Sequence, residues 1–236
     1  YWDWGMEDDD LFWRCNLEGY LNSTNLKLNN STRDFLRFDG VDSFVEIPAT
    51  RSLRNITSRS HTVSVLVRAQ QQEEKVPIWL VGDEERQFIE YPIFRRPGYD
   101  WGLSYNNSRA YTLQLWNNEK QHLYQWMKRY ENKWTWVTFV VDDNKVHFYM
   151  NGKESDARWG TGTHSPLEFT GNLKRYGNVP YYLGTTTSVP VDNIQRWFKG
   201  DIADLKMWNR ALSSDEVKNI YSFDQLLLAY KAVCLG

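Results

Sequence analysis

Acidic and histidine side chains, the groups most often used for acid–base chemistry, do not form a catalytic set in this sequence. The chain has four histidines, which lie far apart and lack the spacing of a zinc site: His61, His122, His147 and His164. The acidic runs 7–10 and 83–85 fall in a polar tail and a polar turn. No nucleophile–base pair, phosphate loop or dinucleotide fingerprint is present. The sequence therefore predicts a protein without enzymatic activity.

Aromatic and arginine side chains gather in three segments that we interpret as loops, at 95–101, 124–130 and 158–160. Aromatic rings stack on the apolar face of a sugar, and guanidinium groups make paired hydrogen bonds. The candidate ligand-binding residues are Arg95, Arg96, Tyr99, Asp100, Trp101, Tyr124, Trp126 and Trp159. For any one of them, packing at the rim of the protein is the alternative. We expect at least one of these segments to contact a ligand.

The segment KWTWVTFVVDDNKVHFYMNGKES, residues 133–155, predicts a β-meander. Aromatic and β-branched residues occupy both phases of its first half, as in a strand that is covered on both sides. Asp142 to Lys145 has the polar residues of a turn. Asn151-Gly152 suits a type I′ turn, which needs positive φ at both central residues. Core packing is thus the first role for the aromatic residues of this segment.

Other short alternating segments predict further strands, separated by polar turns. They are 35–47 (two strands around Asp39-Gly40), 61–69, 76–81, 101–105, 110–116, 181–185 and 200–208. Residues 121–130 fit a loop or a short helix, and residues 160–180, rich in Gly, Pro, Thr and Asn, fit a long loop.

One segment, NRALSSDEVKNIYSF, predicts a helix. Ser213 can cap its start, and Glu216 three residues later completes a capping box. Many short strands followed by one short late helix indicate an all-β fold, an antiparallel two-sheet sandwich. We expect one globular unit, with an N-terminal arm and first strand region at 1–34 and the main domain at 35–236.

Four segments, in order, resemble a known family. LRFDGVDSFVEIP (36–48), HTVSVLVRA (61–69), KWTWVTFVVDDNKVHFYMNGKE (133–154) and FKGDIADLKMWNRALSSDEVKNIY (198–221) resemble laminin G-like jelly-roll domains of the concanavalin A-like lectin/glucanase superfamily. The second segment departs from the family pattern, because Leu66-Val67 stands where an aromatic residue is usual. The resemblance implies the jelly roll, but it is a weak guide to function because one fold hosts many functions.

The resemblance also implies a structural calcium ion near the first and last strands. Its candidate ligands are Asp39, Asp42, Asp201 and Asp204. Ala203 stands where relatives often carry an acid, and ordinary turn carboxylates are the alternative. The paired carboxylates of the superfamily's glycosidases, spaced as E-x-D-x-x-E, do not occur.

Composition points to an extracellular protein. The net charge of −2 gives no reason to expect a nucleic-acid partner, and no apolar run approaches the length of a membrane span. The only two cysteines, Cys15 and Cys234, lie near opposite ends of the sequence and predict a disulfide that would close a very large loop, with two unrelated buried thiols as the alternative. Five N-glycosylation sequons begin at Asn22, Asn29, Asn30, Asn55 and Asn106.

Three functions follow as hypotheses. The first is a secreted module that binds a glycan or an extracellular glycoprotein. The second is an assembly subunit of an extracellular fibre, coat or adhesion complex, which would use the acidic, aromatic segment Tyr1 to Asp10 for protein contacts. The third is a glycan-active enzyme, which the missing carboxylate pair disfavours.

Overall fold

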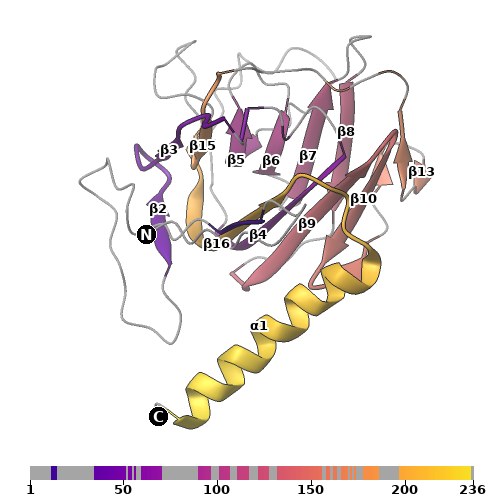
Figure 1. Ribbon diagram of the computed structural model, residues 1–236. Helices are drawn as coiled ribbons and strands as arrows, with labels where there is room; N and C mark the ends of the chain where they lie inside the picture. Colours follow the sequence, from indigo (N-terminus) through magenta and orange to yellow (C-terminus); the bar gives the residue numbers. More distant parts are fainter. Residues whose placement is uncertain are drawn as a thin grey trace.

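Two antiparallel β-sheets face each other in the computed structural model, and one helix follows them (Figure 1). The structure describes residues 12–14, 35–51, 53–54, 56, 60–70, 90–96, 101–106, 111–116, 122–127, 132–155, 158–159, 162–163, 166–169, 171, 173, 178–185 and 197–234. The jelly-roll sandwich expected from the sequence is confirmed.

The first sheet has the strand order β1-β16-β4-β9-β10-β11, with β2 also pairing with β16 and β14 with β10. Its strands are β1 Phe12–Arg14, β2 Leu36–Asp39, β4 His61–Ala69, β9 Thr135–Asp142, β10 Lys145–Met150, β11 Lys153–Glu154, β14 Leu167–Glu168 and β16 Lys199–Trp208. The predicted meander is therefore the β9–β10–β11 part of this sheet, as expected.

The second sheet has the strand order β13-β12-β8-β7-β6-β5-β15-β3. Its strands are β3 Val45–Ile47, β5 Glu90–Arg96, β6 Trp101–Asn106, β7 Tyr111–Trp116, β8 His122–Met127, β12 Arg158–Trp159, β13 Gly162–Thr163 and β15 Tyr181–Leu183. The two strands predicted within 35–47 both exist, but they belong to different sheets, because β2 pairs with β16 whereas β3 pairs with β15.

The inner faces of the two sheets form the main core. Alternate residues of β4, β9 and β10 supply one side of it, including Val65, Phe139 and Phe148. Alternate residues of the second sheet, such as Leu103 and Leu113, supply the other. All five are at most 1% exposed, so the alternation of apolar residues in the sequence corresponds to a buried face on these strands.

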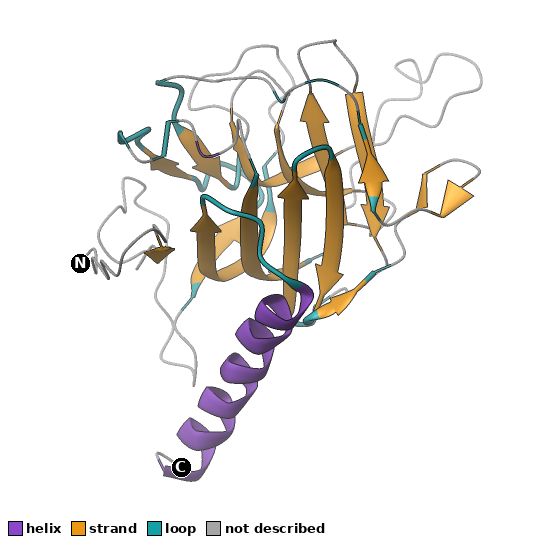
Figure 2. Ribbon diagram, turned by 45° about the vertical axis from the view of Figure 1, so that its right-hand side comes forward, coloured by secondary structure: helices purple, strands orange, loops and turns teal. Residues whose placement is uncertain are grey.

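Helix α1 spans Ser214–Cys234 and starts where the capping box predicts. The Ser213 Oγ accepts a hydrogen bond from the Glu216 backbone N–H, and a Glu216 carboxylate oxygen accepts one from the Ser213 N–H at 2.8 Å. Val217 and Leu212 pack against Val140, Tyr149 and Trp208 on the outer face of the first sheet. The remainder of the helix runs clear of the sandwich in both views (Figures 1 and 2). Within the described part of the chain, no helix is long and apolar enough to cross a membrane.

Two expectations about local structure were wrong. Residues 122–127 form strand β8 and not a loop or helix, because pairing with β7 satisfies their backbone. The long loop expected at 160–180 contains the short strands β13 and β14. Residues 76–81, predicted as a strand, lie outside the described residues, as do the N-terminal segment 1–10, Cys15, and the sequon asparagines Asn22, Asn29, Asn30 and Asn55.

Candidate functional site

The predicted ligand-binding segments are mostly strands of the second sheet. Arg95 and Arg96 end β5, and Trp101 begins β6. Tyr124 and Trp126 lie in β8, and Trp159 lies in β12. Residues placed in strands occupy fixed register positions, so these candidates belong to a sheet face and not to separate flexible loops. Tyr99 and Asp100 lie outside the described residues.

Register brings three of the candidates into two adjacent rows across the second sheet. One row is Glu46, Tyr182, Arg95, Gly102, Gln114 and Tyr124, taken strand by strand from β3 to β8. The next row is Pro92, Ser104, Thr112, Trp126 and Arg158, from β5 to β12. These rows alternate with the buried positions Leu103 and Leu113, so they belong to the outer face of the sheet. We call them the outer rows.

The composition of the outer rows changes across the sheet. Their middle holds the small residues Gly102, Ser104 and Thr112. Register positions with long polar or aromatic residues lie on either side, with Arg95 toward β15 and with Tyr124 and Trp126 in β8. A sheet face with this composition has residue types that bind sugars, namely aromatic rings and hydrogen-bonding groups.

Aromatic rings pack together where the first row reaches the β15–β3 edge. The Tyr182 hydroxyl donates a 2.8 Å hydrogen bond to the Glu46 carboxylate. The Phe44 ring lies 6.3 Å from the Tyr182 ring and 6.1 Å from the Trp197 ring, centroid to centroid. Tyr182 is buried, while Phe44 and Trp197 are half-buried, so this cluster supports one end of the outer rows.

The other candidates do not share the outer rows. Trp101 pairs with Leu115 and Arg96 pairs with Trp101, which puts both in the phase of the buried Leu115. Trp159 follows Arg158 and pairs with Gly162, in the opposite phase to the row that contains Trp126. Side chains alternate between the two faces of a strand, so the predicted ligand-binding residues are divided between the two faces of the sheet. Their interpretation as loop residues could not predict this division.

The four aspartates predicted to bind calcium make other contacts. Asp39 Oδ1 accepts hydrogen bonds from the backbone N–H groups of Val41, Asp42 and Ser43, at 2.8, 3.2 and 3.3 Å. Burial favours a raised pKa for Asp39, but these hydrogen bonds outweigh it and lower the pKa. Asp204 lies 3.1 Å from the Lys206 amine. Among the described residues no three acidic, histidine or cysteine side chains converge, and calcium binding stays a prediction.

Asp201 lies at the centre of an arginine cluster on the outer face of the first sheet. Its side chain is 0% exposed. Oδ1 accepts a 2.8 Å hydrogen bond from Arg37 Nε, and Oδ2 accepts bonds from Arg68 Nε and Nη2 at 2.8 and 2.6 Å. The hydrogen bond and charge of Asp201 raise the pKa of Arg37. The hydrogen bonds and positive charges of the two arginines offset the desolvation free energy of burying the Asp201 carboxylate.

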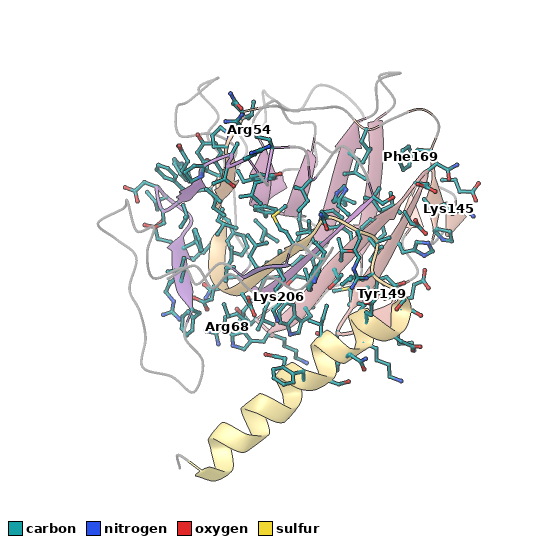
Figure 3. The ribbon with its side chains drawn as sticks, in the orientation of Figure 1. Arg54, Arg68, Lys145, Tyr149, Phe169 and Lys206 are labelled. Atoms are coloured by element: carbon teal, nitrogen blue, oxygen red, sulfur yellow. The ribbon has the colours of Figure 1, made fainter. Side chains whose placement is uncertain are left out.

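Two aromatic rings complete this cluster. The guanidinium carbon of Arg68 lies 4.9 Å from the centroid of the Trp134 ring and 5.4 Å from that of Phe35. The guanidinium of Arg37 lies 5.3 Å from Phe35, and the two rings meet edge-on at 5.6 Å. We call Phe35, Arg37, Arg68, Trp134 and Asp201 the arginine cluster. Figure 3 shows Arg68 on the side of the sandwich that helix α1 leaves from.

Sequence reasoning missed the arginine cluster except for Asp201. A usable signal was present, because Arg37, Arg68 and Asp201 are charged residues that each adjoin a core residue of their strand, Leu36, Val67 and Ile202, and so lie in the opposite phase. Opposite charges on one face of a sheet favour cross-strand pairs. Only the register, which pairs Asp201 with both Arg37 and Arg68, identifies these three as partners.

Comparisons with known proteins agree with the fold. Residues 39–218, about three quarters of the chain, match a laminin G-like family model described as the concanavalin A-like lectin/glucanases superfamily. No curated protein matched the chain in sequence.

Solved structures with the same fold are distant in sequence. The binding domain of botulinum neurotoxin serotype G shares 14% identity at a TM-score of 0.58, with 85% of this chain and 45% of that chain covered. The binding domain of Paraclostridial Mosquitocidal Protein 1 shares 14% at 0.57, covering 84% and 45%. Trypanosoma rangeli sialidase shares 15% at 0.53, covering 86% and 30%.

The chain thus spans less than half the length of each of these solved chains, and at such low identity the likeness shows the fold alone. The family model rests on the sequence itself and covers both sheets. On that match, the chain belongs to the concanavalin A-like lectin/glucanases superfamily.

Proposed function

We propose that this chain is a non-catalytic module of an extracellular protein that binds a glycan, free or on a glycoprotein, on the outer rows of its second sheet. The observation that carries the proposal is the register, which aligns Arg95 on one face with Tyr124 and Trp126 although Arg95 is distant from them in sequence. The superfamily membership and the toxin binding domains among the similar folds are consistent with a binding module.

The outer rows suit a glycan because they combine aromatic and polar residues at adjacent register positions. Gly102 in the first row is buried, so contacts with a ligand fall to the positions on either side of it. The aromatic positions in β8 can then stack on a sugar ring, while Gln114 and Arg95 are able to bond its hydroxyls. Such a site orients a sugar without supplying the two opposed carboxylates of a glycosidase.

The first test is binding to a glycan array, run with calcium and again with a chelator. We expect binding in at least one condition. Loss in chelator supports an ion near the site, and binding in both conditions limits the ion to a structural role. Absence of binding by folded protein in both conditions contradicts the proposal. Turnover of any bound glycan contradicts its non-catalytic part.

One substitution tests whether the glycan binds on the outer rows. Trp126→Ala is expected to weaken binding of the best array glycan by about tenfold, since stacking on an aromatic ring and its burial together supply on the order of 1–2 kcal/mol. The matched control is Phe223→Ala, which removes a ring that is 67% exposed on helix α1, far from the second sheet. Equal affinities for the two variants contradict the placement on the outer rows.

One observation favours the assembly subunit as a second candidate. Helix α1 extends beyond its contacts with the sandwich (Figure 2), and Phe223 on this helix is 67% exposed. Sedimentation velocity of the purified chain separates the two functions, because an assembly subunit self-associates with increasing concentration whereas a monomeric module does not.

A further inference from the structure

The arginine cluster lies on the first sheet, apart from the outer rows of the second, and it is charged. Asp201 neutralises one of its two arginines, so the cluster keeps a net positive charge. On the same face, the Asp39 carboxylate accepts three backbone N–H hydrogen bonds, and Asp204 is paired with Lys206. The charge that remains is therefore on Arg37 and Arg68.

Hydrogen-bonding capacity remains as well as charge. Arg37 bonds Asp201 through Nε alone, which leaves its Nη1 and Nη2 without a hydrogen bond among the described residues. The Arg37 side chain is 47% exposed, so this fork is open to solvent. Arg68 uses Nε and Nη2 and keeps Nη1. A guanidinium fork of this kind matches the spacing of two oxygens on a carboxylate or sulfate.

The cluster is rigid enough to act as a site. Arg68 is fixed by two hydrogen bonds to a fully buried carboxylate and lies against two rings. Arg37 is anchored by the other oxygen of the same carboxylate. Because Asp201 holds both guanidinium groups before a ligand arrives, less side-chain entropy is lost on binding than for free surface arginines.

We propose that Arg37 and Arg68, with Trp134 beside them, bind the oxyanion of an acidic glycan, a sulfate or carboxylate on a sugar ring. The half-buried Trp134 ring lies 4.9 Å from the Arg68 guanidinium, so an anion on the arginines brings its carrier to this ring. The C–H groups of a pyranose pack well against the exposed part of an indole, which favours a sugar over an extended acidic peptide as the carrier of the anion. The exposed Lys133, next to Trp134 in sequence, adds positive charge.

The test is calorimetric titration of the full chain with three octasaccharides, one heparin-derived and sulfated, one hyaluronan-derived and carboxylated, and maltooctaose as the neutral probe. We expect binding of at least one acidic octasaccharide, weaker at high salt, and none of maltooctaose at this site. The sulfated and carboxylated arms identify which oxyanion is preferred. A poly-glutamate peptide is titrated in parallel.

Arg37→Gln is the informative variant, because Arg68 still pairs with Asp201. It is expected to weaken acidic octasaccharide binding by about tenfold or more, the usual cost of one charge-assisted pair. Arg54→Gln is the matched control. It removes the same charge from an exposed arginine that lies on the opposite side of the view from Arg68 (Figure 3), and affinity should change by less than about twofold, as for a distant surface charge.

Three results overturn the proposal. One is equal affinity of Arg37→Gln and Arg54→Gln for the acidic octasaccharides. Another is binding of poly-glutamate as tight as that of the octasaccharides and equally sensitive to Arg37→Gln, which makes the ligand an acidic peptide. The third is no binding of either acidic octasaccharide at low salt. Trp126→Ala should leave acidic binding at Arg37 unchanged, so failure here is distinct from failure on the outer rows.

Discussion

At the scale of single residues, the most informative side chains are those whose contacts could not be predicted from the sequence. Glu216 is the exception, since its partner Ser213 is local and the capping box was predicted. The structure adds Arg210, whose two terminal nitrogens lie 2.7 and 3.1 Å from the Glu216 carboxylate oxygens. The hydrogen bond from Arg210, against the opposing effect of burial, lowers the pKa of Glu216 from 4.5 to about 2.

Replacing this carboxylate should destabilise the protein in a pH-dependent way. Glu216→Gln is expected to lower the free energy of unfolding at pH 7 by about 0.5–1 kcal/mol, a value reduced for solvent screening because the side chain is 41% exposed. The folded pKa is depressed, so the stabilisation is present above pH 4.5 and is lost as the pH falls toward about 2. Chemical denaturation of both proteins between these pH values measures it.

The control for this prediction is Glu168→Gln. Glu168 is 67% exposed and lies 3.5 Å from the Lys145 amine, so its loss should change stability by less than about 0.5 kcal/mol at any of these pH values. A wild-type advantage over Glu216→Gln that persists unchanged to low pH would falsify the assignment of the stabilisation to the charged carboxylate.

At the scale of elements, the β10–β11 turn and helix α1 depend on each other. Asn151 and Gly152 have φ values of 53° and 73°, as the predicted type I′ turn requires. A Cβ on Gly152 would lie 2.9 Å from Tyr221 Cβ and 3.2 Å from Lys218 Cα. Glycine is therefore needed here both for the backbone conformation and for the approach of the helix.

Gly152→Ala is expected to lower the free energy of unfolding by about 2 kcal/mol, because it combines backbone strain with overpacking. The double variant Gly152→Ala/Tyr221→Gly separates the two effects. It should recover part of the loss that the sum of the single variants predicts, since the Tyr221 Cβ that lies 2.9 Å from the new methyl group is gone. Strict additivity of the two substitutions in urea unfolding would show that contact with the helix does not contribute.

At the scale of the whole molecule, the two outer faces carry different features. The second sheet presents the outer rows, and the first sheet carries helix α1 and the arginine cluster. The inner faces meet in one core, and the chain crosses between the sheets several times, as between β2 and β3. Both proposed glycan sites are thus held by the same core but lie on opposite sides of it.

The predicted Cys15–Cys234 disulfide belongs to this scale because it would join the two ends of the fold. Strand β1 ends at Arg14 and helix α1 ends at Cys234. We expect the intact mass of non-reduced protein to be lower than that of reduced protein by two hydrogens. Reduction should lower the free energy of unfolding by up to about 4–5 kcal/mol, the chain-entropy value for so large a loop. Equal masses before and after reduction would refute the disulfide.

The sequence by itself determined the elements whose signals are local. The period of two located the β4, β9, β10 and β16 strands, Asn151-Gly152 located a turn, and the capping box located the first residue of the helix. It also determined the family, because the matching segments keep their order along the chain. Hydrogen bonds and burial within a few residues are enough to specify such features.

Only the tertiary structure decided which residues share a site. The β8 strand has no strong local signal and exists through its pairing with β7, which is what aligns Trp126 with Thr112 and Arg158. The sequence suggested Asp201 as a metal ligand. In the structure it lies between Arg37 and Arg68, which are 164 and 133 residues away along the chain. They meet because β2 and β4 both pair with β16. Register between distant strands is set by the burial of whole faces, and no short segment contains that information.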